Sequence, residues 1–277
     1  MKIINHRNEI EITDFTDFDI KKTFECGQCF RWDVDDNGAY TGVAFGLATG
    51  VRKCGESIFI SCTEKDFFSV WCNYFDLDRD YTIIRQQLCI DEFMQNATEY
   101  GKGIRILKQD KWEALCSFII SQNNNIPRIK KIINTLCREF GDELEYEGNK
   151  YHSFPSAEKI ASLDIGELSV LRCGYRAEYI KRSAEMIIKG CINLDALADD
   201  TPENTRNALK TLHGVGDKVA DCVMLFGFHM FDAFPLDVWM KRAVAKHYGS
   251  GFDPNIFNPY AGIAQQYIFY YTRNTTS

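Results

Sequence analysis

The sequence predicts an α+β fold, in which a small antiparallel β-sheet near the N-terminus packs on a mostly α-helical body that contains a helix–hairpin–helix motif. Two observations predict it. The run Asp36-Asn37-Gly38 signals a hairpin, because Asn-Gly accepts the positive φ angles of a tight turn. From about residue 64 onward, apolar residues recur at helical spacing instead. We therefore expect a β-rich domain over residues 1–90 and a helical body over residues 91–277.

The predicted strands are short. The segment from Thr23 to Trp32 mixes aromatic and polar residues and is predicted to be part of the β-rich region. Tyr40 to Ala48 and Ser57 to Cys62 are predicted to be two strands, with glycines between them. Consecutive hairpins of this kind indicate an antiparallel sheet.

The predicted helices follow. Apolar residues indicate helices over residues 112–120 and 126–140. Ser156 begins another helix after Pro155. Thr201-Pro202 is a clear start signal, since a capping hydroxyl precedes a proline at the first helical position. We see no internal repeat and no linker rich in Gly, Ser or Pro, so we expect the sheet and the helices to share one compact body.

Composition excludes several classes of protein. Of the 277 residues, 45% are hydrophobic and 26% are charged, which is typical of a globular chain and not of a disordered one. The longest mostly apolar stretch, Cys222 to Leu236, is too short to span a membrane, and the N-terminus lacks the apolar core of a secretory signal. The eleven cysteines are scattered, and the pair Cys26 and Cys29 has no partner pair at metal spacing. We expect free thiols in a reducing cytoplasm, with nucleoid association in a prokaryote.

The charge is unevenly distributed along the chain. The net charge of −7 argues against indiscriminate binding to nucleic acid. Residues 1–100 carry 10 Lys and Arg against 18 Asp and Glu, whereas residues 101–277 carry 22 against 21. Residues 101–131 hold seven basic and two acidic side chains. This stretch indicates either a local phosphate-binding patch or a solvated helix face.

The most informative stretch is a helix–hairpin–helix at about residues 202–226. An amphipathic helix from Pro202 ends near Leu212, and Gly214-Val215-Gly216 then forms a turn that glycine permits. A second helix starts at about Asp217. Free amides in the turn and at the start of this helix suit a phosphate, so Gly214 and Gly216 are predicted to contact DNA. The alternative is an ordinary turn between two helices.

Lys218 lies in the first turn of that second helix. A cation there opposes the helix dipole, and burial would further favour the neutral amine. A neutral lysine can attack a carbon atom and form a Schiff base. Cys222 is four residues on and shares its helical face. The alternative is a solvated lysine bound to a phosphate.

Asp237 directly precedes an apparent helix from Val238 to His247. It can therefore act as an N-cap, and the simplest interpretation ends there. In the functional interpretation, its carboxylate is aimed at the chemistry of Lys218.

Together these residues resemble the helix–hairpin–helix DNA glycosylases that carry a Gly/Pro-rich segment and an aspartate. The hairpin, lysine and aspartate occur in the expected order, and the resemblance covers most of the chain. The closer resemblance is to the 8-oxoguanine DNA glycosylase/lyase group. It is supported by three segments: Gly27-Gln28-Cys29-Phe30-Arg31-Trp32, Ser121-Gln122-Asn123-Asn124-Asn125-Ile126 followed by Arg128, and Ala261-Gly262-Ile263-Ala264-Gln265 followed by Phe269.

The resemblance implies a bifunctional DNA glycosylase/AP lyase of base excision repair that removes 8-oxoguanine opposite cytosine. The damaged base would be flipped into a pocket. Lys218 would attack C1′ and leave a Schiff base, β-elimination would nick the strand, and Asp237 would stabilise the charge that develops on the sugar. In the implied pocket, Phe269 and Cys222 sandwich the purine, Gln265 binds its Watson–Crick edge, and the Gly27 carbonyl accepts the N7 proton that guanine lacks.

The resemblance also implies contacts to the opposite strand. Asn123 would fill the gap left by the flipped base, Arg128 and Arg176 would bind the widowed cytosine, and Tyr175 would wedge into the stack. Each has a simpler alternative. The asparagine run resembles a helix-capping turn, and Tyr175 and Arg176 could be surface residues before a helix.

The sequence departs from the family pattern at Trp239, where relatives can carry a histidine that contacts a phosphate. No cysteine follows Cys222, so no iron–sulfur cluster is expected. We expect no cofactor and no metal. The expected partner is double-stranded DNA containing oxidised guanine. We expect the protein to be a monomer and not to associate with a membrane.

Three rival functions are consistent with parts of the sequence. One is a glycosylase for another lesion, such as an alkylated base, although such relatives typically lack the lysine. Another is a non-catalytic DNA-binding protein, which would need neither Lys218 nor the pocket formed by Gly27 and Gln265. The third is a thiol redox protein that uses Cys26 and Cys29, and it lacks the expected βαβ context.

Overall fold

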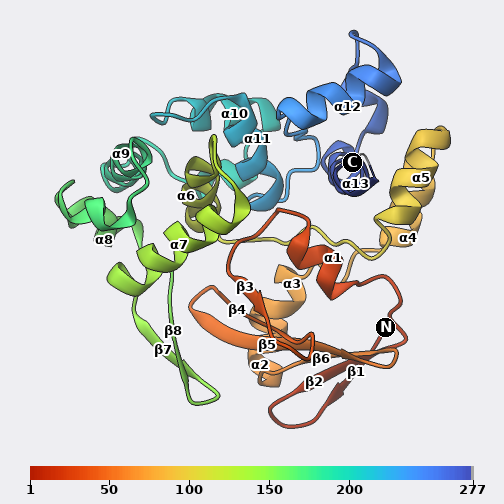
Figure 1. Ribbon diagram of the computed structural model, residues 1–277, viewed down its shortest axis with the longest axis horizontal. Helices are drawn as coiled ribbons and strands as arrows, with labels where there is room; N and C mark the ends of the chain where they lie inside the picture. Colours follow the sequence, from red (N-terminus) through yellow and green to blue (C-terminus); the bar gives the residue numbers. More distant parts are fainter. Residues whose placement is uncertain (276–277) are drawn as a thin grey trace.

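The computed structural model describes residues 1–275 and confirms the α+β fold class. An antiparallel six-stranded sheet lies below the helical body in Figure 1, and a separate two-stranded hairpin descends beside it. The strand order of the larger sheet is β1-β2-β6-β5-β4-β3. Among the described residues, no helix is long and apolar enough to cross a membrane.

The strands of both sheets are short. They are β1 (Lys2–Asn5), β2 (Ile10–Thr13), β3 (Trp32–Val34), β4 (Tyr40–Ala44), β5 (Leu47–Cys54), β6 (Ser57–Ile60), β7 (Glu143–Tyr146) and β8 (Asn149–His152).

The helices make up most of the remaining chain. They are α1 (Ile20–Glu25), α2 (Glu64–Asp66), η1 (Phe67–Trp71), α3 (Cys72–Tyr74), α4 (Tyr81–Leu88), α5 (Glu92–Tyr100), α6 (Lys111–Ser121), α7 (Ile126–Phe140), α8 (Ala157–Ser162), η2 (Glu167–Leu171), α9 (Arg176–Ile188), η3 (Ala196–Asp199), α10 (Pro202–Lys210), α11 (Asp217–Phe226), α12 (Val238–Tyr248), η4 (Pro254–Phe257) and α13 (Ala261–Thr275).

The prediction of β-structure from Thr23 to Trp32 was wrong for most of that segment. Its first residues belong to the helix α1, and only Trp32 enters a strand. Asp19 caps α1 by accepting a hydrogen bond from the Lys22 amide at 2.9 Å. The buried side chains Ile20, Thr23 and Phe24 follow the i, i+3, i+4 spacing of one helix face. Helical spacing over so few residues is easily mistaken for a strand pattern.

The predicted single strand from Tyr40 to Ala48 is two strands, β4 and β5. A two-residue turn, Phe45-Gly46, separates them, and Ala44 pairs directly with Leu47. Both turn residues have positive φ, 50° at Phe45 and 74° at Gly46. Positive φ at both central residues suits a two-residue hairpin. The turn signal was missed because phenylalanine is an unusual first residue for this conformation.

The helices predicted in the second part of the sequence are confirmed, and the structure adds one hairpin that was not predicted. The helix α7 has the predicted bounds, Ser156 caps α8, and Thr201 caps α10. The hairpin β7–β8 between α7 and α8 was not predicted. Its turn, Glu147-Gly148, again has positive φ at both residues.

The buried residues form two hydrophobic clusters, one packed against the sheet and a larger one among the helices. The segment after α1 contributes to both. Cys26 and Phe30 belong to the helical cluster, while Cys29 and Trp32 belong to the sheet cluster. The intervening Gly27 therefore lies where the two cores meet.

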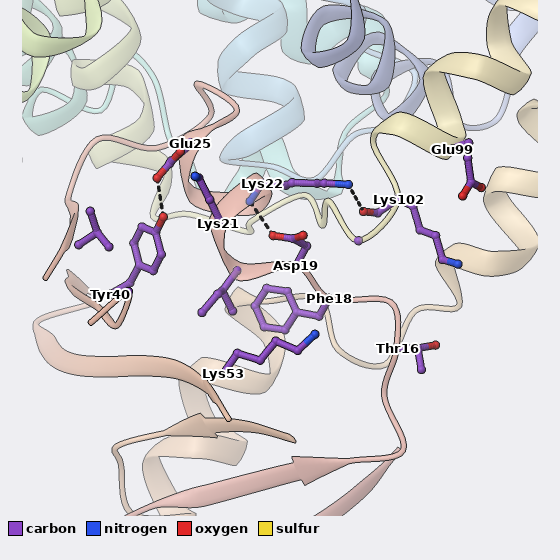
Figure 2. A pocket seen from close by; sticks show the side chains of 14 residues that line it. Thr16, Phe18, Asp19, Lys21, Lys22, Glu25, Tyr40, Lys53, Glu99 and Lys102 are labelled. Atoms are coloured by element: carbon purple, nitrogen blue, oxygen red, sulfur yellow. Dashed lines mark hydrogen bonds between the residues drawn. The ribbon is translucent and has the colours of Figure 1, made fainter. Parts of the chain in front are cut away.

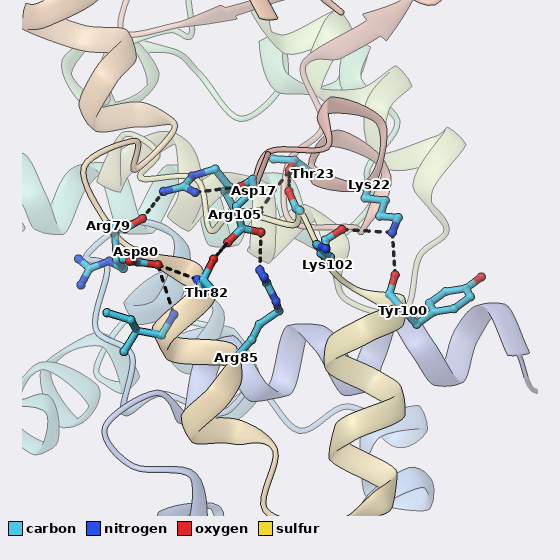
Figure 3. Close-up of polar contacts among 12 residues, drawn as sticks. Asp17, Lys22, Thr23, Arg79, Asp80, Thr82, Arg85, Tyr100, Lys102 and Arg105 are labelled. Carbon is cyan, nitrogen blue, oxygen red and sulfur yellow. Dashed lines mark hydrogen bonds and ion pairs between the residues drawn. The ribbon is translucent and has the colours of Figure 1, made fainter. Parts of the chain in front are cut away.

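Arg105 connects three loops at this junction (Figure 3). Its side chain is fully buried and donates to the backbone carbonyls of Asp17 and Phe75 at 3.0 Å each, to that of Arg79 at 2.8 Å, and to that of Asp76. The guanidinium also stacks on the Tyr81 ring, 4.3 Å from its centroid. Burial lowers the pKa of Arg105, and the surrounding carbonyl oxygens offset that effect by solvating the cation.

The helix α1 is held against the end of α5 (Figure 2). The Lys22 ammonium donates to the carbonyls of Tyr100 and Lys102, and the Asp19 amide donates to the Gly103 carbonyl. A hollow of about 590 Å³ lies beside these contacts. Two of its three acidic side chains are already engaged, since Asp19 caps α1 and Glu25 accepts from the Tyr40 hydroxyl. The contacts fix α1 and thereby the chain that leads to Gly27.

Candidate active site

The predicted hairpin lies between α10 and α11. Gly214 has φ +80°, and a Cβ there would lie 2.1 Å from the Tyr179 ring. Glycine is required at this position by both conformation and space. Gly216 is the N-cap of α11, has φ −98°, and would meet nothing within 4 Å if a Cβ were added. The first-turn amides of α11 have no intrahelical acceptor, so they are available to an anion.

The two hairpin glycines make a matched pair for mutation. We expect Gly214→Ala to destabilise the fold by about 2 kcal/mol, because the left-handed backbone is strained and Tyr179 must move. Gly216→Ala should unfold near the wild-type temperature, because its backbone suits any residue. Thermal unfolding of both variants checks this. Equal destabilisation by the two substitutions would contradict it.

Lys218 extends from α11 toward α6. Its Nζ lies 3.3 Å from the Ser121 hydroxyl oxygen and 5.4 Å from the centroid of the Phe118 ring. Cys222, one turn further along α11, is buried. Burial raises the pKa of the Cys222 thiol to about 11. The thiol is therefore protonated at neutral pH and is a weak nucleophile.

Asp237 caps α12, as its simplest interpretation predicted. One carboxylate oxygen accepts a hydrogen bond from the Met240 amide at 2.7 Å. Asp237 also lines the same two hollows as Lys218. The cap and the functional interpretation are thus compatible, because capping uses one carboxylate oxygen and fixes the orientation of the other.

A cavity of about 360 Å³ joins residues from five separate parts of the sequence. Lys218 and Asp237 line it, and so do Gly27 and Phe269. A Cβ on Gly27 would lie 3.5 Å from the Phe269 ring, so backbone and ring are in near contact. The remaining lining residues are Phe30, Phe118, Ser121, Asn124, Asn125, Ile126, Ile129, Trp239, Thr272 and Arg273.

Gln265 and Cys222 are not lining residues of this cavity but lie buried on the same helices as Phe269 and Lys218. The Gln265 side-chain carbonyl oxygen is buried and has no hydrogen-bond partner among the described residues. Buried polar atoms are rarely left unpaired. A donor on a bound molecule would satisfy this oxygen.

A larger hollow of about 840 Å³ continues from the cavity between the asparagine run and the start of α12. Gly216 and Lys218 of the hairpin line it, together with Asn123 and Asn124. Trp239, which is 53% exposed, lines both hollows. The exposed indole at this boundary offers a face for stacking on a base.

The asparagine run and the start of α9 are tied together by Arg176. Its side chain is buried, and its guanidinium donates to the carbonyls of Gln122, Asn123 and Cys173. It is therefore not a surface residue, and this alternative for Arg176 was wrong. In this structure Arg176 holds the backbone that presents Asn123, an exposed residue with φ +47°.

The other residues predicted at the opposite strand are accessible. Asn125, the last of the run, caps α7 by accepting from the Arg128 amide, so the capping interpretation is correct for that residue. The exposed Arg128 side chain donates to the Arg172 carbonyl at 3.3 Å. Tyr175 is 47% exposed and packs against Tyr179, which in turn contacts His213 beside the hairpin.

Sequence reasoning missed three side chains at this site. Ser121 and Phe118 contact Lys218, and Arg273 lies against Phe269 with its guanidinium 5.9 Å from the ring centroid. Phe118 lies on the predicted helix and Ser121 directly follows its predicted end, so one more residue of helix would have placed both on one face. Within residues 1–275, no group of three or more His, Cys, Asp or Glu side chains is arranged to hold a metal ion.

Comparison with known proteins shows two family matches. Residues 11–115 match the 8-oxoguanine DNA glycosylase N-terminal domain, and residues 116–255 match the HhH-GPD superfamily of base excision DNA repair proteins. An N-glycosylase/DNA lyase of Saccharomyces cerevisiae is 37% identical over 255 residues, which cover 83% of this chain and 68% of the yeast protein.

Solved structures are similar over the full chain. One is an 8-oxoguanine glycosylase/lyase of Clostridium acetobutylicum, in complex with double-stranded DNA containing cytosine opposite to 8-oxoguanine. It has a TM-score of 0.94 and 37% identity, and the match covers 100% of this chain and 99% of that one. Another, MBOgg1 in complex with a low-affinity DNA ligand, has a TM-score of 0.95 and 42% identity, with 100% of both chains covered.

Proposed function

The chain belongs to the HhH-GPD superfamily of base excision DNA repair proteins, among the N-glycosylase/DNA lyases with an 8-oxoguanine DNA glycosylase N-terminal domain, and on this basis we propose its reaction and the roles of its residues. The protein is a DNA glycosylase with AP lyase activity that excises 8-oxoguanine from double-stranded DNA. The observation that carries the proposal is the cavity where Lys218 and Asp237 meet Gly27 and Phe269.

In the proposed reaction, the damaged nucleotide leaves the helical stack and its base enters the cavity. The Lys218 amine attacks C1′ as the bond from C1′ to the base breaks, and the departing base keeps the electron pair and takes up a proton. The second carboxylate oxygen of Asp237 stabilises the positive charge on the sugar. Opening of the sugar ring leaves a Schiff base. Loss of a C2′ proton then breaks the C3′–O bond and nicks the strand.

Base selection is proposed to come from the walls of the cavity. Phe269 and Cys222 enclose the purine, and the unpartnered Gln265 oxygen accepts from its Watson–Crick edge. The Gly27 carbonyl accepts the N7 proton of 8-oxoguanine. Guanine has no such proton, and its N7 lone pair would face an unpaired carbonyl, which is penalised.

The hairpin is proposed to bind the backbone of the damaged strand through the amides near Gly214 and Gly216. On the opposite strand, Asn123 fills the gap, Tyr175 wedges into the stack and Arg128 contacts the widowed cytosine. For Arg176, its hydrogen bonds to the asparagine run support an indirect contribution, in which it holds Asn123 in place. A direct contact with cytosine would require those hydrogen bonds to open.

The eleven cysteines are all free thiols, and eight of them are buried. We propose that the enzyme works in a reducing compartment, the cytoplasm or nucleoid, because the exposed thiols would otherwise be open to oxidation. The cavity residues themselves carry the proposed chemistry without a cofactor.

The test is incubation with duplex DNA containing 8-oxoguanine opposite cytosine in the presence of borohydride. We expect a covalent protein–DNA adduct, because borohydride reduces the Schiff base to a stable amine. The same duplex with guanine in place of 8-oxoguanine should give none. Free base without an adduct would assign the attack to water and contradict the role of Lys218. If no base is released from the duplex that contains 8-oxoguanine, then 8-oxoguanine is not the substrate.

A further inference from the structure

The loop at Gly27 is held by buried side chains on both sides, while its own carbonyl is left free. Gly27 has φ +88° and lies against Phe269. None of the hydrogen bonds among residues 1–275 ends on the Gly27 carbonyl oxygen. The carbonyls of the residues before and after it, Cys26 and Gln28, each accept a hydrogen bond from a buried glutamine.

Gln266 and Gln109 make these two contacts, and the Gln28 side chain anchors the same loop; we call Gln28, Gln109 and Gln266 the glutamine clamp. All three are buried. The side-chain amide of Gln266 donates to the Cys26 carbonyl at 2.9 Å, and the side-chain amide of Gln109 donates to the Gln28 carbonyl at 2.7 Å. The clamp therefore fixes the two peptide units that flank the Gly27 carbonyl.

Each glutamine anchors the loop to a different element. The Gln28 side chain donates to the carbonyls of Thr23 and Arg105 and accepts from the Leu107 amide. The backbone N–H of Gln109 donates to the Phe226 carbonyl at the end of α11, the helix that carries Lys218. Gln266 lies on α13, directly after Gln265 and three residues before Phe269.

We propose that Gln266 is a positioning residue that sets the selectivity of the enzyme for 8-oxoguanine over guanine, by fixing the Gly27 carbonyl relative to Gln265 and Phe269. The inference rests on the proposed function. Selection by a single N7 proton requires the acceptor to be rigid, because a mobile carbonyl can turn away from guanine and avoid the unfavourable contact. The hydrogen bond from Gln266 joins that acceptor to the helix that holds the other two selecting groups.

Gln266 is the member of the clamp best suited to a test. Gln28 is fully buried and supports several backbone groups, so its loss would disturb the fold as a whole. Gln266 makes one hydrogen bond with its side-chain amide. Gln266→Met keeps the approximate length of the side chain and removes the donor.

The experiment compares two reactions of the same variant. The Gln266→Met variant should excise 8-oxoguanine opposite cytosine about tenfold more slowly than the wild type, which corresponds to the free energy of about one hydrogen bond. Nicking at a preformed abasic site should keep its wild-type rate, because that substrate has no base to select. In a Lys218→Gln background, the ratio of duplex affinities for 8-oxoguanine and guanine should fall by a similar factor.

The matched control is Thr205→Val. Thr205 is also fully buried, and its hydroxyl donates to the Leu197 carbonyl at 2.9 Å, so this change also removes one hydrogen bond to a backbone carbonyl. It should leave the affinity ratio unchanged. Gln266→Leu serves as a second variant and should behave as Gln266→Met does.

Two results would overturn the proposal while leaving the enzyme's function intact. One is an unchanged ratio in both Gln266 variants, and the other is an equal loss of excision and of nicking at the abasic site, which would indicate a merely structural role. If the wild-type protein nicks abasic DNA but does not excise 8-oxoguanine, the proposed substrate fails instead.

Discussion

Replacement of Lys218 by glutamine is expected to abolish the borohydride-trapped adduct and to slow base excision by about 10³-fold or more, the order seen when a covalent nucleophile is removed. Glutamine keeps much of the side-chain length but has no amine to attack C1′. Its amide can still contact the Ser121 hydroxyl, which lies 3.3 Å from the lysine nitrogen in the wild-type structure. Binding of the damaged duplex should therefore persist.

Single-turnover excision and gel-based trapping measure this effect, and duplex binding is measured separately. Lys246→Gln is the matched control, because Lys246 is exposed in the last turn of α12 and its loss also removes one positive charge. It should trap as the wild type does. If Lys218→Gln loses binding and excision in parallel, then Lys218 acts by gripping a phosphate and another group is the nucleophile.

Arg105→Met is expected to destabilise the protein by about 3–5 kcal/mol, the largest stability effect we anticipate. The substitution removes the guanidinium that donates to the carbonyls of Asp17, Phe75, Asp76 and Arg79. Methionine can fill part of the volume but cannot donate. Several carbonyls would then be buried without partners, and each costs about 1–3 kcal/mol unless the loops rearrange.

Chemical denaturation with urea measures the free energy of unfolding of this variant. Arg79→Met is the control from the same loop region. Arg79 pairs with Asp76, but its side chain is 37% exposed, so its loss should cost about 1 kcal/mol or less. Similar destabilisation by the two substitutions would mean that the buried hydrogen bonds of Arg105 contribute little net stability.

The long helices and the hairpin could be predicted from the sequence because their signals are local. Thr201-Pro202 and Ser156 mark helix starts through side-chain and backbone chemistry within a few residues. The helix α1 and the turn at Phe45-Gly46 could not be predicted in the same way. Burial of Ile20 and Phe24 in the sheet core decides the first, and strand pairing on both sides imposes positive φ on Phe45.

Prediction of the site had a similar limit. Lys218 and Asp237 are marked by their places at two helix starts, and these places are confirmed. Contacts between distant segments leave no such mark. Nothing local indicates that Arg176 is buried against the asparagine run, that Ser121 meets Lys218, or that Gln266 reaches Cys26. The sequence therefore predicts the chemistry better than it predicts the supports that position it.

The hydrogen bond from Gln266 to Cys26 joins residues 240 positions apart in the chain. The nucleophile Lys218, by contrast, lies on α11, which the hairpin joins directly to the preceding helix α10. Contacts between residues that are far apart in the sequence cost conformational entropy to form, and they break when one of the two elements detaches locally. Base selection and strand nicking should therefore be lost at different temperatures. As the protein warms toward unfolding, we expect it to lose discrimination between bases before it loses the ability to cut an abasic strand.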